Sequence, residues 1–192
     1  MRTLPIIILA FLLIVSNKVQ SQVLWTLDHA HSNLRFTITH LMVSEIDGTI
    51  KMKEGTITTL HDDFSDASLN IVGDMKTIDT DNDARDEHLK TPDSFDVEKY
   101  PLFTFQSTSF KKIDEHHYTV SGQLTFHGIT KIVVLDAVAN VGVNPYDNKT
   151  LVGFKVTGTI KRSDYNISAD SPSAVVSDDV AIKANVEFIK NQ

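Results

Sequence analysis

Two histidines separated by a single residue near the start of the chain are the first candidates for a metal or catalytic site. His29 and His31 stand within WTLDHAHSNLRFTITH, residues 25–40. Residues two apart on a strand project to one face, and neutral imidazole is a common zinc ligand. The pair could therefore hold a divalent ion, with a third ligand from another histidine or a carboxylate.

A structural interpretation of the same pair competes with the metal one. Trp25 and Leu27 place the apolar face on odd positions, whereas Leu34 and the residues after it place it on even ones. The register must slip between them, as at a β-bulge, and the imidazoles would then hydrogen bond to backbone groups that the bulge leaves unpaired. Because short spacings alone are weak evidence, we favour the structural interpretation and predict no metal site.

The stretch ARDEHL offers a second cluster of chemically useful side chains. Arg85, Asp86 and His88 would lie within one helical turn, which is close enough for acid–base chemistry. An ion pair that anchors this helix across a barrel mouth is the simpler interpretation, and the Arg85 guanidinium could also bind a carboxylate or phosphate head group. The chain has no G-x-S-x-G, H-E-x-x-H or glycine-rich phosphate motif. We therefore predict that the protein is not an enzyme.

The composition limits the function classes. The 192 residues are 41% hydrophobic and 22% charged, which is typical of a globular protein. The lack of cysteine excludes disulfides, thiolate metal sites and a cysteine nucleophile. When Arg2 and Lys18 are removed with a leader segment, the 18 basic residues become 16 against 25 acidic ones, a formal charge of −9. This sign disfavours nucleic acid as a partner.

Residues 1–21 have the pattern of a secretory signal peptide. Arg2 precedes an apolar run from Leu4 to Val15, and small residues stand before a cleavage point. The run is shorter than the ~20 apolar residues that a membrane span needs, and no second such run follows. The sequence predicts a periplasmic or secreted protein, no transmembrane segment in the mature chain, and one domain over residues 22–192.

Alternation of apolar and polar residues dominates the chain from Trp25 onward. With turn residues between the runs, it indicates about eight β-strands. The polar interval Thr80–Pro101 is the exception and predicts a short helix at Asp83–Lys90, with Thr80 or Asp81 as its N-cap. We predict an all-β fold, an eight-stranded antiparallel β-barrel, because closure removes exposed strand edges. Such a barrel is filled by its own side chains or holds one small ligand.

Five segments, in combination and order, resemble the YceI-like proteins, which are often described as periplasmic polyisoprenoid-binding proteins. They are WTLDHAHSNLRFTITHLMVSEIDGTI, IDTDNDARDEHLKTPDSFDVEKYPLFTFQS, GQLTFHGITK, GTIKRSDYNI and VSDDVAIKANVEF, and they extend from Trp25 to about Phe188. The resemblance implies a lipocalin-like barrel whose long apolar channel holds an isoprenoid or fatty-acyl chain, with a short helix and loops near the opening. It implies no established catalysis.

The polar signature of that family can be placed residue by residue on this chain. It falls on Asp28, His31, Ser32, His40, Arg85, Asp86, His88, Leu89, Phe95, Pro101, Phe105, Gly122, Leu124, Gly128, Thr130, Lys131, Arg162 and Asp164. The family usually shows glycine where this chain has Asn166. Asparagine tolerates the left-handed backbone region better than most residues, so we expect the turn to survive.

Inward-facing apolar residues are the candidate lining of the channel. Gly73, Gly122 and Gly158 are small inward residues that would leave room. The candidate lining residues are Leu34, Phe36, Ile38, Phe103, Phe105, Val120, Leu124, Val134, Phe154, Val156, Ile182 and Val186. The candidate head-group contacts at the rim are His31, Arg85, Asp86 and His88.

Three hypotheses for the function remain. The first, which we favour, is a binding protein that sequesters or transports an isoprenoid-like or fatty-acyl lipid in the periplasm, with the lipid as ligand and no cofactor. The second is a metal- or histidine-dependent enzyme that acts on a periplasmic lipid. The third is a scaffold whose interior is simply filled. Homodimer formation through an exposed strand face stays open.

Overall fold

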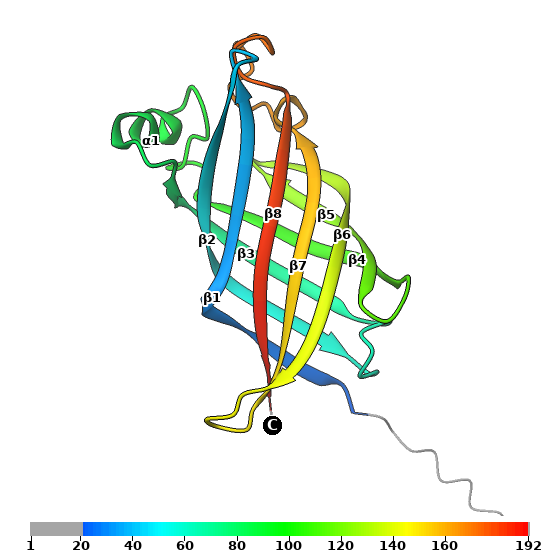
Figure 1. Cartoon of the computed structure of the whole chain (residues 1–192). Helices are drawn as coiled ribbons and strands as arrows, with labels where there is room; N and C mark the ends of the chain where they lie inside the picture. The colour runs from blue at the N-terminus through cyan, green and yellow to red at the C-terminus, as the bar shows by residue number, and fades with distance from the viewer. Residues whose placement is uncertain (1–20, 192) are drawn as a thin grey trace, which may run out of the picture.

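The computed structural model describes residues 21–191, so the predicted signal peptide lies outside the described residues except for Ser21. Eight strands, one α-helix and one 3-10 helix make up the fold in these residues (Figure 1). They are β1 (Val23–His40), β2 (Ser44–Thr59), β3 (Ser68–Asp79), α1 (Asp83–Lys90), β4 (Leu102–Lys112), β5 (His117–Phe126), β6 (Ile129–Val143), β7 (Thr150–Lys161), η1 (Arg162–Tyr165) and β8 (Asp179–Lys190).

The strands form one closed sheet. Each pairs antiparallel with the next along the chain, and β8 pairs with β1, which closes the ring. The predicted eight-stranded antiparallel barrel is confirmed. Among the described residues, no helix is both long enough and apolar enough to cross a membrane.

The predicted register slip in β1 is present. Opposite β2, Thr26 pairs with Thr56 but Asn33 pairs with Lys51, and opposite β8 the register also shifts between Asp28 and Asn33. Extra residues on β1 therefore bulge outward between these points. The bulge lets the odd-numbered apolar residues before it and the even-numbered ones after it both face inward.

Helix α1 has the predicted bounds but a different N-cap. The cap is Asn82, whose side-chain oxygen accepts a hydrogen bond from the backbone N–H of Arg85 at 2.9 Å. The predicted caps, Thr80 and Asp81, were wrong. Thr80, Asp81 and Asn82 all belong to residue types that favour this position, so residue type alone could not select among them.

Aromatic rings fill the end of the barrel that lies away from α1. Phe64, from the β2–β3 loop, contacts Trp25 and Phe154 with ring centroids 5.3 and 5.5 Å apart. Phe154 also contacts Phe110 and Phe188 at 5.7 and 6.3 Å. All five rings are buried, and their tilted and edge-on packing is favourable. They form an aromatic plug that closes this end.

The space directly beside the inward glycines is occupied by side chains of neighbouring strands. A Cβ at Gly73 would collide with the Phe103 ring, and one at Gly122 would collide with the Phe105 ring. Leu135 occupies the space beside Gly158 in the same way. Large side chains from neighbouring strands therefore lie against the wall over the glycines, and the interior remains open at the barrel axis.

This packing predicts opposite effects for two Gly→Ala substitutions. Gly73→Ala should lower the free energy of unfolding by about 1–3 kcal/mol, because the Phe103 ring must move away from the wall. Gly153→Ala is the control, since nothing lies within 4 Å of its added Cβ, and it should be neutral or raise stability by up to about 1 kcal/mol. Urea denaturation measures both. Equal stabilities of the two variants would contradict the packing.

Candidate functional site

The barrel encloses a cavity of about 600 Å³. Its wall comes from all eight strands, and the aromatic plug residues Phe110, Phe154 and Phe188 form its floor. Its polar lining residues come from α1, from either side of the β1–β2 turn and from the connections at the same end of the barrel, and we call this end the mouth. The volume falls within the usual range for small-molecule pockets. The interior is therefore not filled by the protein's own side chains.

Most of the predicted lining residues face this cavity. Those that line it are Leu34, Phe36, Ile38, Phe103, Phe105, Val120, Leu124, Phe154, Val156, Ile182 and Val186. Leu34, Phe36 and Ile38 are only half-buried although they point inward, because they border open space rather than packed neighbours. Contact of these residues with a ligand stays a prediction.

Val134 is the exception, and its predicted place in the lining was wrong. Its side chain is 60% exposed on the outside of β6, and the neighbouring Val133 lines the cavity instead. Leu135 and Ala137 continue the inward face on odd positions. Because the segment KIVVLDAVANV is apolar on both faces, alternation could not decide which parity points inward.

Several lining residues were missed although the sequence carries their signal. Ile50 and Met52 of β2 line the cavity and alternate with Lys51 and Lys53, which is a clear period-two pattern. At the mouth, Ser94 and other small polar residues also line the cavity, and the sequence gives no comparable signal for them.

Arg85 and His88 line the cavity at the mouth, as predicted, but Asp86 does not. Arg85 donates from Nε to Thr80 Oγ1 at 2.7 Å and from Nη2 to the Thr80 carbonyl at 2.6 Å. Asp86 is buried, and its Oδ1 accepts hydrogen bonds from the backbone N–H and the hydroxyl of Thr80 at 3.0 and 2.5 Å. Asp86 therefore positions Arg85 through Thr80 and is not itself a rim contact.

Buried Arg162 holds the long β7–β8 connection beside the mouth. Its five guanidinium N–H groups donate at 2.5–3.2 Å to the backbone carbonyls of Ile167, Ser168, Ser171, Val176 and Ser177. Asn166 has φ 54°, so asparagine does occupy the left-handed turn that we expected to survive with this residue. One side chain thus fixes the shape of a loop of more than ten residues.

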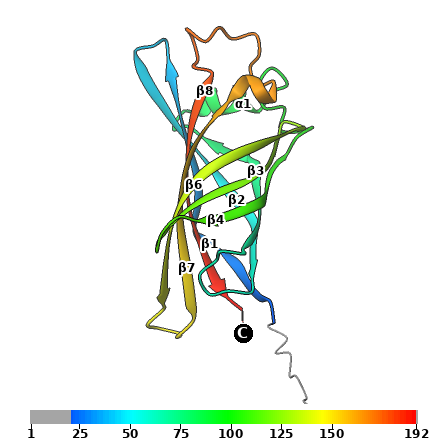
Figure 2. The same ribbon diagram turned by 90° about the vertical axis from the view of Figure 1, so that its right-hand side faces the viewer.

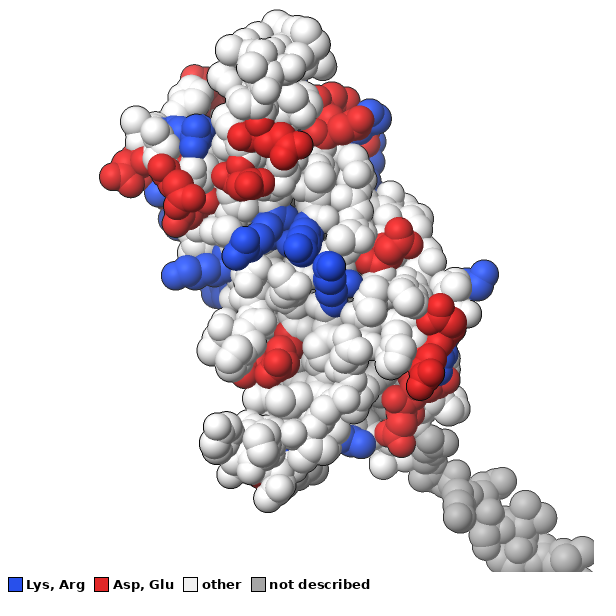
Figure 3. All heavy atoms as spheres, viewed as in Figure 1, with Lys and Arg blue, Asp and Glu red and all other residues white. Residues whose placement is uncertain are grey.

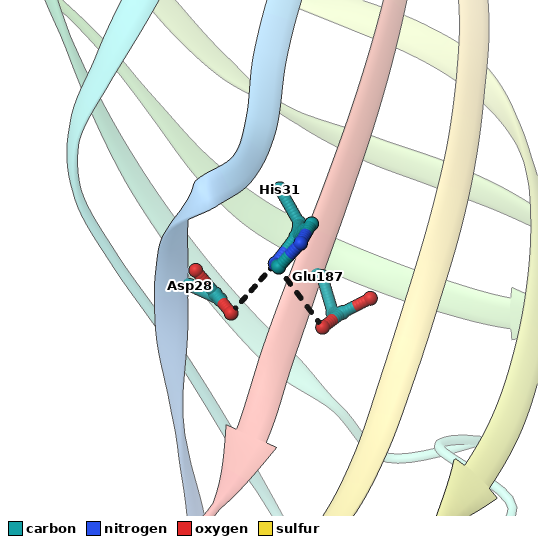
Figure 4. Close-up of side chains that lie close together, drawn as sticks. All are labelled: Asp28, His31 and Glu187. Atoms are coloured by element: carbon teal, nitrogen blue, oxygen red, sulfur yellow. Dashed lines mark hydrogen bonds and ion pairs between the residues drawn. The ribbon is translucent and has the colours of Figure 1, made fainter. Parts of the chain in front are cut away.

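His31 lies on the outer surface and not at the rim, so its predicted place was wrong. It is 66% exposed, and its Nδ1 is 2.9 Å from Asp28 Oδ2 and 3.8 Å from Glu187 Oε1 (Figure 4). The outward bulge of β1 carries Asp28 and His31 to this face, and the buried Ser32 hydroxyl accepts the Glu187 N–H at 3.0 Å. The hydrogen bond to Asp28 raises the pKa of His31, and it lowers the pKa of Asp28.

The histidine pair therefore separates into two local contacts. His29 Nδ1 lies 3.4 Å from the Met52 carbonyl, as the structural interpretation expects, whereas His31 forms its ion pairs with carboxylates. The ligand atoms of Asp28, His31 and Glu187 lie within 4.8 Å of one another, so within residues 21–191 this is the trio that could hold a cation. Its ion pairs already explain its arrangement, and it lies outside the cavity.

Comparison with known proteins places the chain in a family. The profile of the YceI-like domain matches residues 25–188. The chain belongs to the YceI-like family. A UPF0312 protein of Staphylococcus aureus is 36% identical over 169 residues, which cover 85% of this chain and 96% of that protein.

Solved structures share the fold of this YceI-like protein. The Campylobacter jejuni YCEI protein is 31% identical, with a TM-score of 0.69 over 80% of this chain and 90% of that one. A polyisoprenoid-binding domain from Saccharophagus degradans is 14% identical, with a TM-score of 0.64 over 87% of this chain and 98% of that one. At that identity the second likeness concerns the fold alone.

The ion pair on the outer surface predicts the titration of His31. Its pKa should lie above the ~6.5 of a free histidine, and Asp28→Asn should bring it back toward that value while keeping the oxygen that accepts the Ala30 N–H. The stability that protonation of His31 contributes is fully present below the pKa of His31 in the unfolded chain. It is lost as the pH rises through the pKa of His31 in the folded protein. NMR titration of the imidazole measures the shift. The same His31 pKa in both proteins would exclude this pairing in solution.

Proposed function

We propose that this protein binds one apolar chain, isoprenoid-like or fatty-acyl, inside its barrel and thereby sequesters or transports it outside the cytoplasm. The observation that carries this proposal is the cavity of about 600 Å³, whose deep wall is aliphatic and aromatic and whose floor is the aromatic plug. Each methylene moved from water into such a space contributes about 0.8 kcal/mol. About ten methylenes would contribute roughly 8 kcal/mol before the cost of immobilising the chain.

The shape of the cavity suggests how a ligand would lie. Because the plug closes one end, the tail would enter at the mouth and point toward Phe154, and the depth would limit the length that is fully buried. Polar side chains of the lining gather at the mouth, where a head group would remain. Arg85 uses two of its five N–H donors on Thr80, so the others suit a carboxylate or phosphate head.

A binding role, and not catalysis, is the function that these features favour. The wall contains few groups that could transfer a proton, and the cluster of Asp28, His31 and Glu187, the trio found within residues 21–191, is on the outside of the barrel. The fold is shared with a domain that is named for polyisoprenoid binding. The leader-like pattern of residues 1–21 supports a periplasmic or secreted location.

Organic extraction of the protein purified from its own cells, followed by mass spectrometry, tests the proposal. We expect about one isoprenoid-like or fatty-acyl molecule for each protein molecule. An empty extract, together with no uptake of a fluorescent fatty acid or isoprenoid by the extracted and refolded protein, would contradict it.

Two neighbouring valines on β6 give a matched test of the cavity as the binding site. Val133→Glu places a carboxylate in the cavity, where it must remain ionised beside the ligand or take up a proton, and it should weaken binding of a fluorescent fatty acid at least tenfold. Val134→Glu places the same group in solvent and should leave the affinity unchanged. Fluorescence titration measures both. Equal affinities would show that the probe binds elsewhere.

A further inference from the structure

The turn between β1 and β2 presents three consecutive apolar side chains to solvent. Leu41, Met42 and Val43 are 51%, 76% and 86% exposed. Val175 of the β7–β8 connection is also exposed, and its carbonyl accepts the Leu41 N–H at 2.9 Å. We call these four residues the apolar tip. Single exposed apolar residues are ordinary, whereas a contiguous group at the end of a hairpin marks a contact surface.

The backbone of the tip is also one that these residues disfavour. Leu41 has φ 51° and Met42 has φ 56°, and the Val43 N–H donates to the His40 carbonyl at 3.0 Å, which is the pattern of a type I′ turn. Asparagine and glycine are the usual residues there, because side chains without local hydrogen bonding are strained in the left-handed region. Neither the conformation of the turn nor its exposure to water therefore accounts for leucine and methionine at these positions. Contact of their side chains with an apolar surface outside the protein would account for them.

The tip borders the mouth of the cavity. The residues on either side of the turn, His40 and Ser44, line the cavity, as does Val176, which pairs with His40. The hairpin reaches the same end of the barrel as α1 and the β7–β8 connection (Figure 2). If the tip contacts a bilayer, an apolar molecule could pass from that bilayer into the cavity without crossing bulk water.

The charges around the tip limit which bilayer it suits. On the face seen in Figure 3, the top of the molecule shows no charged side chain and lies above a group of acidic side chains. Glu45 and Asp47 follow the turn on β2, and Asp178 and Asp179 lie where β8 begins. Lys161 forms ion pairs with Asp178 and Asp179 and offsets one of the four negative charges. The remaining negative charge would be repelled by an anionic surface, so apolar insertion into a zwitterionic one is favoured.

We propose that the apolar tip inserts into the surface of a zwitterionic lipid bilayer and holds the mouth of the cavity against it. This inference rests on the proposed function for its purpose, because a lipid ligand must be collected from, or delivered to, a membrane. The insertion itself depends only on the tip, so it can be tested separately.

Flotation of the mature protein with phosphatidylcholine vesicles tests insertion. The double variant Leu41→Asn/Met42→Gly removes two apolar side chains and installs the preferred turn residues, so its thermal midpoint should be unchanged or higher. Its partition into vesicles should fall about tenfold or more. The control Val141→Ser/Val143→Ser removes two comparably exposed apolar residues from the far end of β6 and should float as the wild type does. Replacing part of the phosphatidylcholine with phosphatidylglycerol should weaken flotation of the wild type.

Three outcomes would overturn the inference. The first is that the wild type does not float, and the second is that the double variant floats as well as the wild type. The third is that neither protein floats and the wild type is a dimer whereas the double variant is a monomer. That result would assign the tip to contact with a second copy of the chain. Loading of a fluorescent fatty acid from solution is measured on the same samples. Loading without flotation rejects membrane insertion and leaves the proposed function in place, whereas flotation without loading rejects the proposed function alone.

Discussion

Closure of eight strands into one ring sets the width of the interior and the side to which each residue points. In a closed sheet every second side chain must point into a space of fixed width. The sheet has no edge at which a side chain too large for that space could lie. Large rings, such as those of Phe103 and Phe105, lie over glycines of the neighbouring strands and so take up little of that width. The barrel consequently encloses a cavity where an evenly packed interior would have none.

The two ends of the ring meet this constraint differently. At one end, Phe64 folds in from a loop and joins rings from several strands, so apolar packing excludes water. At the other end, polar groups are held by hydrogen bonds to the backbone and to one another. Arg162 fixes the β7–β8 connection, and Asp86 fixes Arg85 through Thr80. The cavity therefore has an apolar closed end and a polar end at the mouth.

Much of this could be predicted from the sequence because its signals are local. The period-two alternation predicts the strands, and the change of parity between Leu27 and Leu34 predicts the bulge. The remaining features depend on cross-strand packing. Both faces of the segment that holds Val134 are apolar, so the side that faces inward is decided by its partners in the sheet. The sequence likewise could not show that aromatic rings would fill the space beside the glycines, or that the bulge would carry His31 to the outer surface.

The interior is proposed to hold an apolar chain, and a crystal structure of the protein purified without removal of bound lipid would show whether it does. We expect continuous, tubular electron density that runs from the mouth near Arg85 to the floor at Phe154. A cavity that contains only ordered water, or one that has closed because Phe103 and its neighbours have turned inward, would contradict the claim.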